Sequence, residues 1–141
     1  MERKSRLPGT WKLKAGKLAE ELRLSALAAV ALPRAILFPG RELRRLQGLP
    51  ARGKGAGEET VLRCAGRWFA LLDRLGLRLS CFPRSLVLAR MLRREGHDAQ
   101  LVFGVRSDNG RRKGHCWVSV QGRPIAGKAA GFEELHFDER A

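Results

Sequence analysis

The sequence contains no tyrosine, and its aromatic side chains are limited to six phenylalanines and three tryptophans in 141 residues. Proteins that bind single-stranded nucleic acid stack the bases on aromatic side chains within a basic groove. The chain has no aromatic-rich basic stripe of that kind, and it carries no helix-turn-helix or RNA-module signature. We therefore expect no specific binding of nucleic acid.

Cysteine is also scarce, with Cys64, Cys81 and Cys116 as the only three. An odd number without a Cys-x-x-Cys pair argues against a disulfide framework and against a structural zinc site. We therefore expect reduced thiols, no metal and no other cofactor. The sequence also lacks an apolar signal core before position 18, so we expect a cytoplasmic protein.

No long apolar run is present either. Residues 26–38 are nearly all apolar, but Pro33 and Arg34 interrupt them, and the segment is too short to span a bilayer. We interpret it as part of a helix that packs on the rest of the protein. The alternative is an interfacial helix in weak contact with an anionic membrane surface, which would make the protein membrane-associated.

Acidic residues are few, because 14 Asp and Glu stand against 28 Lys and Arg, which gives a formal net charge of +14. A strongly basic chain attracts acidic partners, which include nucleic acids, anionic membrane surfaces and acidic peptides. The length suits a single domain with a core of its own.

The first 57 residues are predicted to form a basic helical segment that ends in a linker. We expect a mobile arm over residues 1–16, a helix over 17–32 and a short helix over 41–46. The end of the Gly- and Pro-rich stretch 39–57 is predicted to be a flexible linker. Residues at helical spacing predict the core face of the first helix: Leu18, Leu22, Ser25, Ala29 and Leu32.

Residues 58–141 are predicted to form the second unit of the chain, a folded core. A helix over 58–75 carries Cys64 on its apolar face, so Cys64 is expected in the core. After a helix that begins near Cys81, alternating apolar residues predict strands over 99–105 and 115–120, with a turn over 107–114 and a third strand over 123–126. Helices followed by a small antiparallel sheet define an α+β fold.

Cys81 is the first candidate for chemistry, because it is predicted to lie at the start of a helix. Ser80 suits the N-cap, Pro83 suits the first turn, and Gly96 ends the helix. The unpaired N–H groups and the dipole of a helix N-terminus stabilise an anion, and they lower the pKa of a cysteine placed there. The alternative is a buried structural cysteine, which is common for free thiols.

His115 is the candidate base, because a cysteine nucleophile needs a base within hydrogen-bond reach. We expect its ring to lie near the Cys81 thiol. Strand alternation places His115, Trp117 and Ser119 on one face and Cys116 on the other, so Cys116 is predicted to point away from Cys81 and to be packed. His97 and His136 lie at a helix exit and in the acidic tail, where solvated side chains are usual.

Taken together, four segments resemble the transglutaminase-like leader peptidases of lasso-peptide biosynthesis, known as the B proteins of those pathways. The resemblance covers residues 60–126 and rests on the order and spacing of four segments: Cys81-Phe82-Pro83-Arg84-Ser85-Leu86, Leu92–Ala99, Val102–Arg106 and His115–Pro124. It implies a papain- or transglutaminase-like core with a nucleophile helix and a small antiparallel sheet. It also implies Cys81 and His115 as catalytic residues, with a third acid at the position that Gly127 occupies.

The resemblance further implies a cysteine peptidase that removes the leader from a ribosomally made precursor peptide. The implied partners are the precursor peptide, a separate leader-recognition protein and an ATP-dependent lasso cyclase. Two other functions stay open. One is a catalytically weak homologue that acts as a scaffold in the maturation complex, which the missing acid favours; the other is a basic module that binds nucleic acid or a membrane, which the net charge favours.

Overall fold

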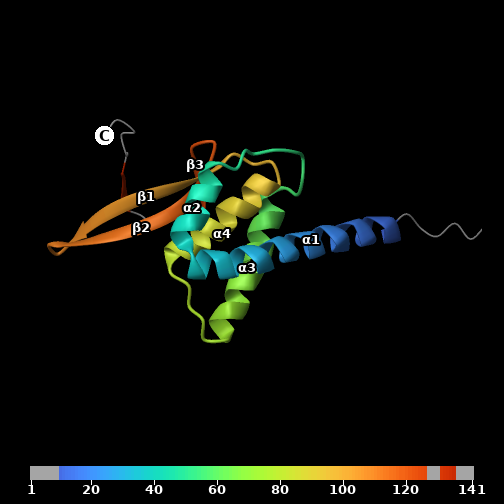
Figure 1. Cartoon of the computed structure of the whole chain (residues 1–141), viewed down its shortest axis with the longest axis horizontal. Coiled ribbons are helices and arrows are strands. Elements are labelled where there is room, and N and C mark those ends of the chain that lie inside the picture. The colour runs from blue at the N-terminus through green and yellow to red at the C-terminus, as the bar shows by residue number, and fades with distance from the viewer. Residues whose placement is uncertain (1–9, 127–130, 136–141) are drawn as a thin grey trace, which may run out of the picture.

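The computed structural model of the chain describes residues 10–126 and 131–135, in which four helices precede a four-stranded antiparallel sheet (Figure 1). The helices are α1 (Thr10–Leu37), α2 (Pro39–Gln47), α3 (Glu58–Arg74) and α4 (Cys81–Arg94). The strands are β1 (Ala99–Asp108), β2 (Arg111–Val120), β3 (Arg123–Ala126) and β4 (Glu133–Glu134), in the order β3-β2-β1-β4. The predicted α+β class is therefore confirmed.

Helix α4 is the centre of the described structure. It packs against α1, α2 and α3, and also against β1 and β2. Its middle is buried because six of the seven residues from Leu86 to Leu92 are apolar, and the seventh, Arg90, pairs with the buried Glu42 of α2. The start of α4 is consequently held in one place by contacts with both the helices and the sheet.

Helix α1 begins earlier than predicted, at Thr10, so residues 10–16 are helical and do not form the expected mobile arm. Residues 1–9 lie outside the described part of the chain. Figure 1 shows the N-terminal end of α1 extending past the other helices. The helix also continues through Pro33, at which it lacks one N–H donor.

The predicted core face of α1 is wrong at three of its five residues, because Leu18, Leu22 and Ala29 are exposed, whereas Leu32 is buried and Ser25 is partly buried. The residues that pack into the core are Leu24, Ala28, Ala31, Leu32 and Ala35. Leu18 and Leu22, by contrast, are 59% and 63% exposed. The reason is that α1 has apolar residues on two faces, and the face with small alanines allows the closer approach to α4.

The segment that was expected to be a flexible linker is held against the end of α4. The buried Glu95 carboxylate accepts a hydrogen bond from the Ala56 backbone N–H at 2.6 Å, and the Glu95 carbonyl accepts one from Gly55 at 3.1 Å. His97 Nε2 bonds to the Ala56 carbonyl at 2.8 Å, so this histidine serves packing here. The division of the chain at residue 57 stays a prediction.

The β1–β2 hairpin is longer than predicted, because both strands extend to a two-residue turn at Asn109 and Gly110. The φ angles of 49° and 76° at these residues belong to the left-handed region that a type I′ hairpin turn requires. Most of the expected loop over 107–114 is therefore strand. Strand β4, which pairs with β1 at Gly104 and Val105, was not predicted.

None of the helices within the described residues combines the length and apolar character that crossing a bilayer requires.

Candidate active site

Cys81 is the first residue of α4, and its side chain is partly exposed. The N-cap residue Ser80 makes no side-chain hydrogen bond to the helix, and no acidic residue lies in the first turn. The N–H groups at this end are therefore not capped by a side chain. Such groups favour an anion, either the thiolate of Cys81 itself or an oxyanion that forms beside it.

Two contacts fix the start of α4 in the fold. The Arg84 guanidinium donates to both oxygens of Asp73 at the end of α3, at 2.7 and 2.9 Å. On the other side, the ring of Phe82 packs against the ring of Phe103 on β1, with their centroids 5.8 Å apart. Both residues flank Cys81 within one helical turn, so the thiol is carried on a rigid element.

Cys116 is the thiol that the structure brings toward Cys81. Ser85 lies one turn after Cys81 on α4, and its hydroxyl donates to the Cys116 carbonyl at 3.2 Å. Burial raises the pKa of the Cys116 thiol to about 11; a hydrogen bond from Ser85 lowers this pKa, and the charge of Cys81 raises it further. Cys116 is 3% exposed, so the prediction that it is packed is confirmed.

The direction in which Cys116 points differs from the prediction. The face of β2 that meets α4 is the one with Val118 and Val120, which belong to the main core. Cys116 alternates with them and therefore shares that face, as does its cross-strand partner Phe103. The physical reason is that the largest apolar set on the hairpin determines which face turns to the helix.

His115 lies next to Cys116 on β2 and belongs to the opposite face. Its ring is 6.1 Å from the Trp117 ring and 5.0 Å from the Phe132 ring, measured between centroids. Cys81 lies one helix turn before Ser85, His115 lies one position before Cys116, and Ser85 contacts Cys116. The expected close approach of the Cys81 and His115 side chains stays a prediction.

Glu134, an exposed residue on β4, is aligned with His115 by the pairing of the strands. Gly104 on β1 pairs with Glu134 on one side and with His115 on the other. Paired residues share a face of the sheet, and neighbouring strands are about 4.8 Å apart, so Glu134 and His115 lie on one face with their backbones roughly 10 Å apart. A two-residue strand gives no sequence pattern that identifies this alignment.

Gly127, at which the resemblance implies a third acid, lies outside the described residues, as does His136. No group of three or more His, Cys, Asp or Glu side chains in the described part of the chain forms a metal site.

A cleft of about 1070 Å³ lies between α2 and the β1 side of the sheet, with Arg93 and Glu134 in its wall. Neither Cys81 nor His115 lines this cleft.

A family model described as the transglutaminase-like superfamily matches residues 25–136. The match covers most of the chain, so the protein belongs to this superfamily, whose members generally have a cysteine-protease-like core. The matched range includes α2, α3, α4 and all four strands, together with residues 25–37 of α1. Corresponding comparisons with curated proteins and with solved structures find no match.

Proposed function

We propose that the protein is a cysteine peptidase in which Cys81 is the nucleophile, and that its substrate is a ribosomally made precursor peptide of the lasso type. The observation that carries the proposal is the position of Cys81, a partly exposed thiol at the first residue of a 14-residue helix. Membership of the transglutaminase-like superfamily supports this type of chemistry. The lasso-peptide role rests on the sequence resemblance.

The proposed reaction is acyl transfer to water. The Cys81 thiolate attacks the carbonyl carbon between leader and core peptide, and the oxygen becomes an oxyanion that the N-terminal N–H groups of α4 stabilise. The carbon–nitrogen bond then breaks, the core peptide leaves as an amine with a proton, and the leader remains on Cys81 as a thioester. Water hydrolyses the thioester and restores the thiol.

His115 is the proposed proton carrier, which takes the proton of Cys81 and gives it to the leaving amine. Its ring must approach Cys81 for this step, and catalytic hydrogen bonds often tighten only when substrate is bound. We propose Glu134 as the acid that orients the His115 ring, because both lie in one row of the sheet across Gly104. This role replaces the one that the resemblance assigns to position 127.

The proposed partners follow from the resemblance. A separate leader-recognition protein would present the precursor peptide, and an ATP-dependent cyclase would close the ring after the leader is removed. The formal charge of +14 supports an acidic leader or an acidic partner surface.

The test is cleavage of a precursor peptide, measured by mass spectrometry with the leader-recognition protein present. Cys81→Ala is expected to abolish cleavage, and His115→Ala to reduce it nearly as far, because nucleophile and base act as a unit. Cys64→Ala and Cys116→Ala are matched controls that remove a buried thiol and are expected to keep most of the activity. Cleavage that survives Cys81→Ala would refute the proposal.

A specific observation also favours the scaffold function. The described residues place Cys116, and not His115, on the sheet face that meets the Cys81 helix. If the wild-type protein cleaves no precursor but Cys81→Ala still supports lasso-peptide maturation in cells, the protein acts as a scaffold. Glu134→Gln separates the two functions further, because it is expected to lower cleavage about 10- to 100-fold and to leave a scaffold unaffected.

A further inference from the structure

Helix α1 has a second apolar face, which points away from the core and stays exposed. Ten apolar residues between positions 15 and 37 share this face and are all exposed. We call them the outer face of α1: Ala15, Leu18, Ala19, Leu22, Ala26, Ala29, Val30, Pro33, Ile36 and Leu37. The exposed fractions of Leu22 and Leu37 are 63% and 66%, so these side chains are well outside the range of partly covered core residues.

The outer face is continuous because its residues recur at helical spacing. Each residue turns a helix by about 100°, so residues eleven positions apart differ in direction by only about 20°. Leu18 and Ala29 are such a pair, as are Ala19 and Val30. At about 1.5 Å per residue, the face runs for roughly 33 Å along the helix.

The outer face is accessible to a flat surface. On the same geometry, its centre lies about 150° around the helix from the buried face that contains Leu24, Ala28 and Ala35. The other helices and the sheet therefore pack on the opposite side of α1. The N-terminal end of the helix extends beyond them (Figure 1), so nothing in the described residues blocks an approach to this face.

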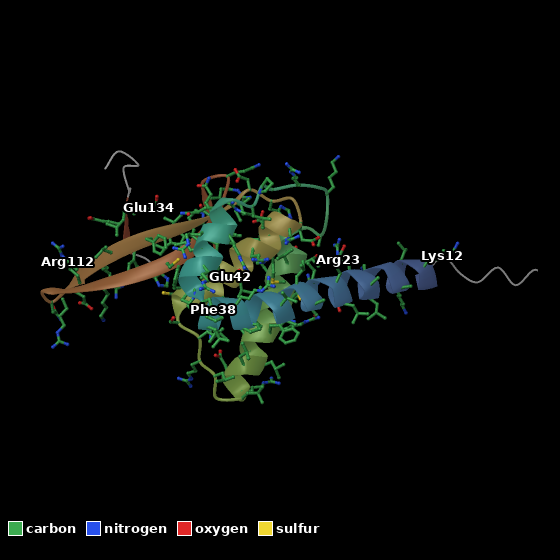
Figure 2. The ribbon with its side chains drawn as sticks, viewed as in Figure 1. Lys12, Arg23, Phe38, Glu42, Arg112 and Glu134 are labelled. Carbon is green, nitrogen blue, oxygen red and sulfur yellow. The ribbon has the colours of Figure 1, made fainter. Side chains whose placement is uncertain are left out.

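Cations lie at both ends of the outer face. Lys12 and Lys14 are exposed in the first turns of α1, where no acidic residue is present. Arg34 and Arg41 are exposed near the other end, and the Arg41 guanidinium lies 5.3 Å from the ring centroid of Phe38. Figure 2 shows Lys12 and Phe38 near the two ends of α1. Positive charge near a helix N-terminus opposes the helix dipole, and an anionic surface offsets this repulsion.

We propose that the outer face of α1 binds the surface of an anionic lipid bilayer, with the helix lying in the plane of the headgroups. An apolar helix face with basic residues beside it is the feature that drives such interfacial binding. Charge argues against a second copy of the chain as the occupant, since two molecules of charge +14 repel each other. This contact is independent of the proposed peptidase activity, and it would bring the protein to the membrane without crossing it.

The experiment uses the full chain and vesicles of phosphatidylcholine, with or without a quarter of phosphatidylglycerol, at 0.15 M salt. Co-sedimentation is expected to show at least tenfold stronger partitioning to the anionic vesicles. The double variant Leu18→Ser and Leu22→Ser is expected to lose at least tenfold of this partitioning. Lys12→Gln and Lys14→Gln are each expected to lose about fivefold, because a basic residue near an anionic surface contributes about 1 kcal/mol.

The matched control is Leu71→Ser with Leu75→Ser, which removes two exposed leucines from the α3 region and is expected to change partitioning less than twofold. All these positions are exposed, so the variants are expected to fold normally. Circular dichroism checks that they do. Equal losses in both double variants, or binding that survives the α1 variant, would refute the proposal and leave general attraction to a basic protein. Absence of binding to anionic vesicles would also refute it. A dimer in sedimentation that the α1 variant dissociates would assign the face to a second copy.

Discussion

Gly104 on β1 is the position at which one added methyl group is expected to do the most damage near the candidate site. A Cβ atom built on Gly104 would lie 2.6 Å from the Cη2 and Cζ3 atoms of Trp117 and 2.9 Å from the Glu133 carbonyl oxygen. Trp117 is completely buried, and the Glu133 oxygen belongs to the backbone of β4. Neither neighbour is therefore the far end of a flexible side chain that could move aside at little cost.

The expected cost of Gly104→Ala follows from these distances. Inserting a methyl group into a packed region typically costs about 1–3 kcal/mol of folding free energy. Because alanine has less conformational entropy than glycine in the unfolded chain, the substitution also stabilises the folded state by about 0.4–1 kcal/mol, which offsets part of this cost. The net loss of unfolding free energy is therefore about 1–2 kcal/mol. With a urea m-value of about 2 kcal/mol/M, the midpoint of unfolding falls by roughly 0.5–1 M. Precursor cleavage should fall as well, because the Trp117 ring contacts His115.

The measurement is urea unfolding followed by tryptophan fluorescence, with Gly114→Ala as the matched control. Gly114 lies next to His115 on β2, and a Cβ atom there would meet nothing within 4 Å. This variant is expected to be unchanged or more stable by up to about 1 kcal/mol, since the unfolded chain loses entropy. Equal midpoints for the two variants would show that Trp117 does not require a glycine beneath it.

Two further predictions concern buried groups. Glu95→Ala leaves the Ala56 N–H without its 2.6 Å acceptor and is expected to lower the free energy of unfolding in urea by about 2–4 kcal/mol. The control Glu59→Ala changes a side chain that is 91% exposed and should lower it by less than about 0.5 kcal/mol. Equal losses in the two variants would contradict this reasoning. Cys116, with a pKa of about 11, should react with iodoacetamide at pH 8 about 100-fold more slowly than a thiol of pKa 9.0, because only its thiolate reacts, and mass spectrometry of the labelled peptides measures the rates. Labelling of Cys116 as fast as that of an unfolded control peptide would refute the second prediction.

The element types were predictable from the sequence because each has a local cause. The spacing of apolar residues identified α3 and α4, and Asn109-Gly110 identified the hairpin, since both residues tolerate the positive φ that the turn requires. The extent of the hairpin was not predictable, because charged residues such as Arg111 and Arg112 carry no strand pattern. Their side chains are exposed, and the strand there is specified by the turn and by pairing with β1.

The orientation of elements was the part that local patterns did not determine. Helix α1 offers two apolar faces, and the periodicity of Leu18 and Leu22 fits a core face as well as it fits an exposed one. The packing of α1 against α4, α3 and α2 selects the alanine-rich face. The same limitation applied to β2, where alternation separates His115 from Cys116 but does not say which of them turns toward the helix.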